Sequence, residues 1–495
     1  MPGVLFIYFC RMMTRCIKLS FCLFTFTFSF AQEKWNLQKC VEYALASNIS
    51  VKQTDLQSQF SSLALKQSKA SQLPSFNFSG SAGNSFGLSE NPTTGILENN
   101  SFFNSGGQLQ AQVSLFNWFS KRNANEANRF TYEADIQQTQ KIKNDVALNV
   151  AVAYLQILLA REQVNLSKVQ VLQTISQLES TQKQVAAGKL PELNAAQLEA
   201  QLATDSSSLI TAGTSVQQFV LQLKALLNLD AGIAFDVETP PVDMIPVEGL
   251  AELQPEYVYI SALTNLPQQK VNELRIKSAL KDMDVAKATM YPAISAFGGL
   301  DTRYVRFPKA PIYNQLIRGY IATPLRADAG GGVFYNVEQP VLQNGNTILG
   351  YVKSDGFGKQ FKENFGQNIG VGLSVPIFNG RRARTSWEQS RLTVKNLELT
   401  KEQGDQQLKQ DIYKAYFDAA AAIQKFHANK KGVQTAQKAY DFANKRYELG
   451  LLSTYELLNS QNTLQTAKTQ LLYAQYDYLF KVKLLEFYKG QGLKL

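Results

Sequence analysis

Histidine and cysteine are scarce in this sequence. Among 495 residues there is one histidine, His427, and there are four cysteines, of which Cys10, Cys16 and Cys22 lie near the N-terminus. A structural zinc site needs four ligands, and with His427 and Cys40 as the one histidine and the one cysteine beyond residue 31 we expect neither a zinc site nor a Cys-His pair within one chain. We therefore expect no catalytic site, no cofactor and no metal site, and we expect His427 to lie at a helix surface or seam.

Long hydrophobic runs are also absent beyond the N-terminus. Residues 1–31 have the pattern of a secretory signal peptide, with basic residues, an apolar run from Ile17 to Phe30 and a cleavage site after Ala31. An uncleaved membrane anchor is the alternative, although the run is short for one. Since no later run reaches about 18 apolar residues, the exported chain is either soluble or crosses a membrane as a β-barrel.

The excess of positive charge is small. The formal net charge is +10, and removal of Arg11, Arg15 and Lys18 with the signal segment leaves +7 (10 − 3). No block of basic residues is interleaved with aromatic residues, which is the usual pattern of a nucleic-acid surface. We expect no nucleic-acid partner.

The chain is a duplication. Gly188 and Gly450 lie in similar segments at a sequence offset of 262 (450 − 188), whereas Pro74 and Pro292 correspond at an offset of 218 (292 − 74). The second copy therefore has 44 additional residues (262 − 218) after its proline, and a repeat of this length is a duplicated supersecondary unit. We expect a signal peptide at 1–31, a first repeat at 32–230, a proline-rich connector at 231–255 and a second repeat at 256–495.

Each repeat reads as a helix, two strands and two long helices. Apolar and small residues recur every four and three positions from Val146 to Val185 and again from Ile412 to Tyr447, which is a heptad pattern. No proline occurs from Lys121 to Ala187, and a helix of that span is roughly 100 Å long. We expect long helices at about 120–187, 192–229, 381–449 and 454–488. An ordinary structural coiled coil has the same pattern.

Four segments alternate between polar and apolar residues. From Gln108 to Leu115 and from Gln367 to Val375, every second residue is Gln, Asn, Ser or Gly. Such alternation is typical of a barrel strand with one face toward lipid and one toward water, although a half-buried soluble hairpin shows it too. Because four such segments adjoin heptad helices in an exported chain, we favour the barrel. The strands are expected at about 75–87, 106–117, 292–304 and 366–378.

Four strands are too few to close a barrel. Open strand edges are not tolerated in lipid, and the smallest common barrel has eight strands. We therefore predict a mixed α+β membrane protein that oligomerises. Two copies would give eight strands and three would give twelve, and the periodicity does not choose between them.

Several features together resemble one known family. They are the duplicated plan, the prolines Pro74 and Pro292 that open a strand, the Ser374 to Arg382 segment (SVPIFNGRR), and the turns at Gly188 and Gly450. In these features the chain is similar to the TolC family of outer-membrane factors over nearly its whole mature length. The resemblance implies a homotrimer whose twelve-stranded outer-membrane β-barrel, with four strands per protomer, continues as a long periplasmic α-helical coiled-coil barrel. It also implies a periplasmic adaptor (membrane fusion) protein, an inner-membrane pump and outer-membrane lipid as partners.

The resemblance implies two functional places. The helical turns are expected to dock the adaptor through Gly188, Lys189, Leu190, Pro191, Gly450, Leu451, Leu452 and Ser453. The pore constriction is expected at Glu456, Asn459 and Asn194. Here the chain departs from the family, which usually has acids at the positions of both asparagines and an arginine at the position of Leu452. A ring of charges from three Glu456 copies would therefore be weaker than the family's.

These expectations combine into one function. We expect the outer-membrane channel of a tripartite efflux system, a passive duct for small molecules in a Gram-negative outer membrane. The alternatives are the duct of a type I protein or peptide secretion system and a surface-anchored structural coiled coil. Strand alternation favours a duct over a coiled coil, but nothing in the sequence distinguishes drug, metal or protein cargo.

The additional residues of the second repeat suggest a long extracellular loop. Phe307 to Asn364 is rich in Gly, Tyr and polar residues, and barrels place their long loops outside. We expect this loop to cover or narrow the outer mouth, or to be only a variable surface loop. Within it, Gly330 to Gly332 lack the following Lys-Ser/Thr of a phosphate loop and are expected to form a flexible turn.

Overall fold

The computed structural model describes residues 34–90, 97–240, 249–306 and 310–490. The predicted signal peptide at 1–31 lies outside these residues, and so does part of the predicted connector. The chain divides into two compact units. One contains residues up to 63, 129–279 and those from 393 onward, and the other contains 64–128 and 280–392.

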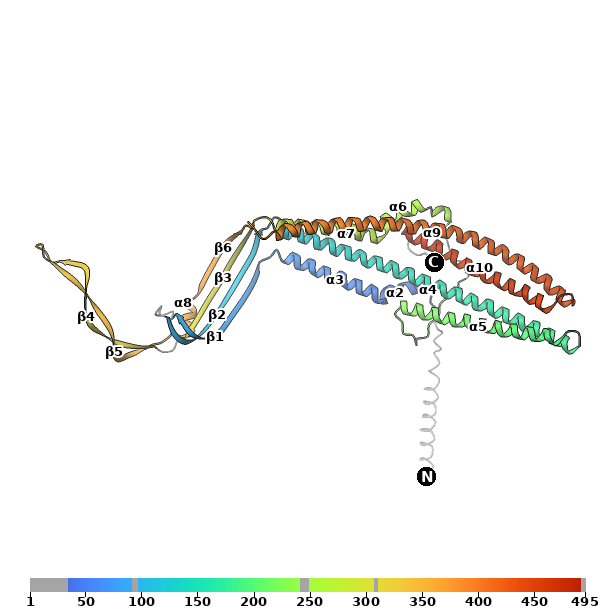
Figure 1. Ribbon diagram of the computed structural model, residues 1–495, viewed down its shortest axis with the longest axis horizontal. Coiled ribbons are helices and arrows are strands. Elements are labelled where there is room, and N and C mark those ends of the chain that lie inside the picture. Colours follow the sequence, from blue (N-terminus) through green and yellow to red (C-terminus); the bar gives the residue numbers. More distant parts are fainter. Residues whose placement is uncertain (1–33, 91–96, 241–248, 307–309, 491–495) are drawn as a thin grey trace, which may run out of the picture. The chain divides into compact units, whose positions relative to one another are not determined.

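A four-stranded antiparallel sheet forms the main part of the second unit (Figure 1). Its strands are β1 (Ser75–Glu90), β2 (Leu97–Phe116), β3 (Ala293–Arg306) and β6 (Gly366–Ser374), in the order β1-β2-β3-β6. β2 begins at Leu97, well before the expected position 106. β6 ends at Ser374, before the expected position 378, because the following Pro376 has no N–H to donate to a strand ladder.

The strand register gathers most of the apolar residues of all four strands on one face. One row across the sheet consists of Phe76, Ala111, Gly298 and Ile369, and the next row, on the opposite face, consists of Asn77, Gln110, Gly299 and Asn368. Within the described parts of the chain nothing covers the apolar face at Ile369, which is 93% exposed. The sheet therefore has one face suited to lipid and one suited to water, as the alternation predicts.

The segment 307–364, predicted as a long loop between two barrel strands, is mostly regular structure in the part that the structure describes. Residues 310–352 form a second antiparallel hairpin of strands β4 (Ala310–Asp328) and β5 (Phe334–Val352), and helix α8 (Phe357–Glu363) follows. Its turn contains Gly330, Gly331 and Gly332, all with positive φ. Alternation could not reveal these strands because both faces carry apolar residues. The neighbours Tyr320 and Ile321, for example, are each 62% exposed.

Helices make up the rest of each repeat. The first repeat contains α2 (Leu37–Ser47), α3 (Ile49–Ala70), α4 (Ser120–Ala186) and α5 (Glu192–Leu226). The second contains a 3-10 turn (Leu250–Glu252), α6 (Pro255–Asn265), α7 (Pro267–Ala288), α9 (Arg382–Glu448) and α10 (Thr454–Lys489). The single helix expected at the start of each repeat is two helices. The breaks fall at Asn48 and Leu266, which correspond at the offset of 218 (266 − 48), and both residues have extended backbone angles.

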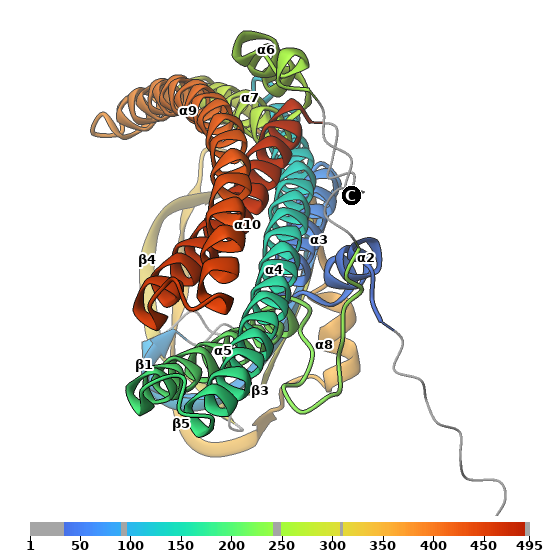
Figure 2. The same cartoon turned by 90° about the vertical axis from the view of Figure 1, so that its right-hand side faces the viewer.

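The two repeats bury matching positions. Val150 and Ile412 correspond at the offset of 262 (412 − 150), as do Ile157 and Ala419 (419 − 157), and all four are fully buried. The α4/α5 and α9/α10 pairs each form an antiparallel helical hairpin (Figure 2). Among the described residues, α4 contains a stretch long and apolar enough to cross a membrane by length and composition alone. Because 44% of that stretch is buried inside the protein, we interpret it as a core-forming segment.

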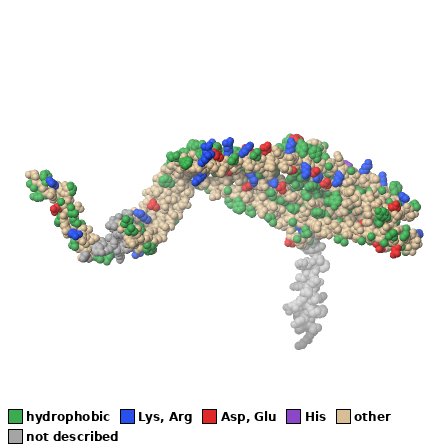
Figure 3. Space-filling model, viewed as in Figure 1, with side chains coloured by type: hydrophobic (Ala, Val, Ile, Leu, Met, Phe, Trp, Pro, Cys, Tyr) green, Lys and Arg blue, Asp and Glu red, His purple; other side chains and the backbone are tan. Residues whose placement is uncertain are grey.

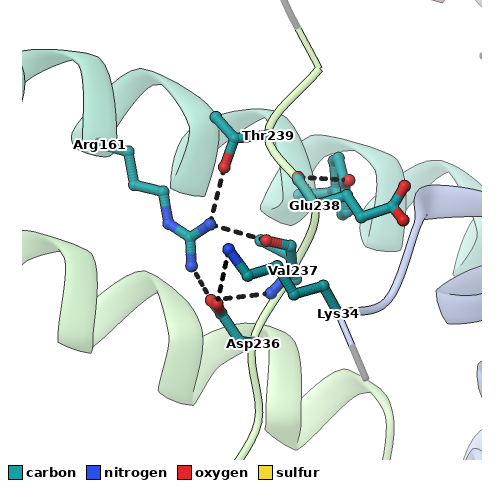
Figure 4. A network of polar contacts seen from close by, with 7 residues as sticks. Lys34, Arg161, Asp236, Val237, Glu238 and Thr239 are labelled. Carbon is teal, nitrogen blue, oxygen red and sulfur yellow. Dashed lines mark hydrogen bonds and ion pairs between the residues drawn. The ribbon is translucent and has the colours of Figure 1, made fainter. Parts of the chain in front are cut away.

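The connector is fastened to α4. Arg161 donates from Nη1 to the Val237 carbonyl (2.7 Å) and the Thr239 hydroxyl (2.8 Å), while Nη2 pairs with the Asp236 carboxylate (Figure 4). Val237 is fully buried and forms an isolated parallel β-bridge with Trp35. The connector and the segment before α2 are therefore held against the same helix.

Phe297 and Gly370 provide a test of the sheet register. They lie opposite each other on the polar face, and a Cβ atom at Gly370 would come within 2.6 Å of the Phe297 ring. A Cβ atom at Gly372, on the same face, would lie 3.5 Å from the Ser295 hydroxyl, an ordinary contact. We expect Gly370→Ala to destabilise the sheet by about 1 kcal/mol, because the new methyl group forces the half-exposed Phe297 ring out of its preferred rotamer. Thermal unfolding in detergent micelles measures this loss.

The matched control is Gly372→Ala, which should unfold at nearly the wild-type temperature. Adding Phe297→Ala to the Gly370→Ala variant should restore most of the lost stability, because it removes the ring that the new methyl group meets. Equal unfolding temperatures for the two alanine variants would contradict the register.

Candidate functional site

Both helical hairpins reverse at a glycine in the left-handed conformation. Gly188 (φ 71°) follows α4, and Gly450 (φ 74°) follows α9. In each turn the residue after the glycine donates its N–H to the carbonyl five residues earlier, Lys189 to Gln184 at 2.9 Å and Leu451 at 2.8 Å. These are Schellman turns, and their positive φ favours glycine. The two turns predicted to dock the adaptor therefore share one geometry.

The tips, defined as residues 188–194 and 449–456, expose several apolar side chains. Leu193, Leu449 and Leu451 are all more than half exposed. Of the other predicted tip residues, Lys189, Pro191 and Ser453 are exposed, and Leu190 and Leu452 are half-buried. Leu193 and Leu449 were not among the predicted tip residues, because heptad spacing does not tell which residues beside a turn have no partner helix to pack against. Exposed leucines at both tips form a surface suited to binding another protein.

Glu456 forms a capping box with Ser453. Its carboxylate accepts hydrogen bonds from the Ser453 N–H (3.0 Å) and hydroxyl (2.8 Å), and its own N–H donates to the Ser453 Oγ (3.2 Å). These bonds, the backbone one foremost, hold the pKa of Glu456 below its ordinary value, and the charge of Arg446 acts in the same direction. The Ser-x-x-Glu spacing could have revealed this box from the sequence.

The two asparagines of the predicted constriction lie in different hairpins. Asn459 is exposed on α10, about one turn after Glu456. Asn194 is half-buried in the first turn of α5, where its N–H donates to the Pro191 carbonyl at 3.1 Å. The protomer thus places Glu456 and Asn459 on one helix and leaves Asn194 on the other hairpin.

A polar seam joins the two hairpins near their tips. The Tyr440 hydroxyl on α9 accepts hydrogen bonds from Gln173 and Gln177 on α4, the second at 2.8 Å. The Tyr447 hydroxyl bonds with that of Thr181 at 2.8 Å. Both tyrosines are buried, and a groove of about 360 Å³ runs beside them. Hydrogen bonds, and not only apolar contacts, therefore connect α4 to α9.

Asp205 is a buried carboxylate within the same seam. It accepts hydrogen bonds from Thr174 (2.7 Å), Gln201 (2.8 Å) and Gln170 (3.5 Å). Gln461 on α10 donates to the Thr174 hydroxyl at 3.1 Å, so this cluster links α4, α5 and α10. Buried polar groups need such partners, which makes the seam specific for one packing of the helices.

Within the part of the chain that the structure describes, no group of three or more His, Cys, Asp or Glu side chains is placed to hold a metal ion. His427 is exposed on α9 beside the Phe426 ring. Cys40 is buried, and burial raises the pKa of its thiol to about 12, so the thiol stays protonated at neutral pH.

Comparison with known proteins identifies the family. The sequence profile of the family described as outer membrane efflux protein matches residues 40–229 and 353–491. The chain belongs to the outer membrane efflux protein family.

Individual relatives agree with this assignment. The outer membrane efflux protein described here is 21% identical over 441 residues to Toxin and drug export protein A of Aggregatibacter actinomycetemcomitans. This alignment covers 89% of this chain and 83% of the relative. Its match to the outer membrane protein TolC of Escherichia coli strain K12 is local, with 27% identity over 124 residues and 25% of either chain. A solved structure of CusC superposes with a TM-score of 0.73 at 18% identity and covers 93% of both chains.

As an outer membrane efflux protein, the chain is an efflux channel of the outer membrane with a periplasmic extension. Its fold is that of the trimeric channels, in which four strands per protomer enter the β-barrel and the long helices form a helical barrel. Proteins of this family are channels. A secretion duct or a structural coiled coil is not better supported than an efflux channel.

The capping box predicts a pH-dependent tip. Because the folded-state pKa of Glu456 is depressed, the stability that its carboxylate adds is present above the unfolded-state pKa and is lost as the pH falls through the folded-state value. We expect amide exchange protection at residues 454–457, corrected for intrinsic rates, to fall between pH 6 and pH 3.5. Hydrogen-exchange mass spectrometry of the full-length protein measures it.

The first hairpin provides the internal control. The residue that begins its return helix is Pro191, which makes no side-chain capping bond, so protection at residues 192–195 should change less. Ser453→Ala should lower protection at 454–457 already at pH 6. A pH response of the same size in both hairpins would rule out the capping box as its cause.

Proposed function

We propose that three copies of this chain form a passive duct that carries small molecules from the periplasm to the exterior. The observation that supports this proposal is the sheet register, which gathers most of the apolar residues of four strands on one face that the described residues leave uncovered. Within the described sheet, β1 and β6 each have one strand neighbour. Three copies joined edge to edge through β1 and β6 make twelve strands, which closes the barrel and removes the open edges that lipid forbids.

A periplasmic adaptor docks at the tips, and an inner-membrane pump supplies the driving force. The support is the repeated tip geometry with its exposed leucines, Leu193 on the first tip and Leu449 and Leu451 on the second. Three copies present six such tips, an arrangement suited to a multimeric partner. The name of Toxin and drug export protein A covers two kinds of cargo, so toxin export through the same duct is the second candidate function.

In-cell crosslinking tests the docking of the adaptor. A photo-crosslinking residue at Lys189 or at Leu451 should trap the adaptor, because both side chains are exposed on the tips. The same residue at Phe78, which is exposed on the apolar sheet face, should trap no adaptor and should instead contact lipid. Adaptor crosslinks at Phe78, or none at either tip, would overturn the docking proposal.

Three copies of Glu456 form the charged part of the pore constriction, with Asn459 and Asn194 nearby. The support is that Glu456 and Asn459 are both exposed on the first turns of α10, and that hydrogen bonds fix the Glu456 carboxylate. A ring of carboxylates favours cations. Because Asn459 is neutral, one carboxylate per protomer carries this selectivity.

Single-channel recording in planar bilayers tests both the duct and the constriction. The wild type should conduct with cation preference. Glu456→Gln should lower that preference while keeping the cap, since glutamine also forms a capping box. Asn459→Asp should raise it. Glu398→Gln removes a carboxylate elsewhere on α9 and should change little. If the wild type does not conduct, the duct proposal is contradicted. If cation selectivity is unchanged in both Glu456→Gln and Asn459→Asp, only the proposed constriction is contradicted.

A further inference from the structure

An aromatic cluster lies where the sheet passes into the helices. The Trp118 and Tyr291 rings have centroids 4.7 Å apart, and Phe116 lies 5.5 Å from Trp118 and 5.8 Å from Phe119. All four side chains are exposed by more than a third. Tyrosine and tryptophan concentrate at membrane–water interfaces, because their rings are apolar and their polar ends can stay wet. The periplasmic surface of the membrane therefore lies at this junction.

Basic residues occupy all four chain segments of the same junction. These junction cations are Lys66, Lys69, Lys121, Arg122, Lys287, Arg381, Arg382 and Arg384. Moving from the sheet into the helices, the first acids appear only at Glu126, Asp284 and Glu388. Lys and Arg side chains also gather at this end of the helices in Figure 3. The junction therefore carries a local excess of positive charge in a chain whose overall excess is small.

Helix stability does not explain all of the junction cations. Lys69 and Lys287 lie in the last turns of α3 and α7, where the helix dipole favours a cation. Lys121 and Arg382 instead lie in the first turns of α4 and α9, where the dipole disfavours a cation and no acid is present. These positions cost helix stability. For Lys121 the cost is partly offset, because its ammonium donates a hydrogen bond to the Ser71 carbonyl just after α3.

Ion pairs within the protomer neutralise only part of this charge. Arg381 and Arg384 share one carboxylate, that of Glu388, at 3.5 Å and 3.1 Å, and their side chains remain 67% and 66% exposed. Arg382 is exposed between them. Three guanidinium groups beside one carboxylate leave a net positive surface, and guanidinium groups can bind phosphate in a bidentate manner.

We propose that the junction cations bind anionic phospholipid headgroups of the periplasmic leaflet, next to the aromatic cluster. The phosphodiester and the net negative charge of such a lipid complement the exposed arginines, while its acyl chains lie along the apolar sheet face. Each cation near an anionic surface strengthens binding about fivefold. The interaction weakens with salt, because these side chains are exposed to solvent.

Fluorescence quenching by brominated lipid tests this proposal, since Trp118 lies in the cluster. The full-length protein is reconstituted into vesicles of brominated phosphatidylcholine mixed with unbrominated phosphatidylglycerol or unbrominated phosphatidylcholine. Phosphatidylglycerol should relieve the quenching of Trp118 at several-fold lower mole fraction than phosphatidylcholine. The triple variant R381Q/R382Q/R384Q should abolish this preference, so that the two lipids relieve the quenching at about the same mole fraction. Trp35→Phe and Trp387→Phe in every protein leave Trp118 as the only tryptophan of the chain, so that the signal reports on the aromatic cluster.

The matched control is K425Q/K430Q/K431Q, which removes three exposed cations from the middle of the same helix and should keep the preference. If the triple variant does not fold, the single variant Arg382→Gln replaces it. Because this side chain is exposed, its loss should reduce the preference for phosphatidylglycerol by up to about fivefold.

The proposal would be overturned if the two lipids relieve the quenching of the wild type equally, or if both arginine variants keep the preference for phosphatidylglycerol. Displacement of phosphatidylglycerol by millimolar inorganic phosphate would also overturn it, because that result would indicate a small-anion site. Single-channel conductance should persist in all variants, so this outcome is separate from that of the duct.

Discussion

A membrane offers no hydrogen-bonding partner to a peptide group, and most of this structure depends on that constraint. The four sheet strands satisfy one another across three ladders, but β1 and β6 at the two ends each have one ladder within the described sheet. In lipid the free sides of these strands must be paired, so a protomer is a fraction of a barrel. The same setting decides the composition of the faces. Ile369 and Phe76 have no covering in the protein because lipid covers them, and Asn77 and Asn368 face the opposite, watery side.

The helical part meets a different requirement, because it stands in water and must hold two long hairpins together over most of their length. Far from the tips the packing is apolar, and duplicated positions such as Val150 and Ile412 are fully buried. Nearer the tips the contacts become hydrogen bonds centred on Asp205, Tyr440 and Tyr447. Apolar packing tolerates small shifts, whereas a buried hydrogen bond is lost at high cost unless both groups find new partners. The hydrogen bonds of the polar seam therefore set the register between the two hairpins. If the hairpins separate at the seam, water can take the place of these hydrogen bonds.

The junction between sheet and helices combines both environments. Trp118 and Phe119 have positive φ angles, as do Gly380 and Arg381, their counterparts at the offset of 262 (380 − 118). Both repeats thus make the same sharp turn as the chain leaves the sheet. Aromatic rings lie at the turn of the first repeat, and exposed cations lie at the turn of the second. A strained backbone therefore occurs in both repeats where the chain meets the lipid boundary and the charged surface.

The sequence alone determined the repeating plan and the presence and order of the four sheet strands and the long helices, because periods of two and of seven residues are local properties that one strand or helix expresses by itself. It did not determine where each strand ends, since β2 begins at Leu97 and β6 ends at Ser374. It did not reveal the β4–β5 hairpin, whose apolar residues lie on both faces, or the breaks at Asn48 and Leu266. Only the tertiary structure showed that the four alternating patterns fall on the same face, because register is a relation between strands. Only the tertiary structure placed Asp205 against Thr174 and Tyr440 against Gln177, because these partners come from different helices and heptad spacing does not say which residues meet. For Glu456 both levels contribute. Its position six residues after Gly450 and the Ser-x-x-Glu spacing of a capping box can be read from the chain, whereas the lengths of its hydrogen bonds to Ser453 and the lowered pKa come from the folded turn.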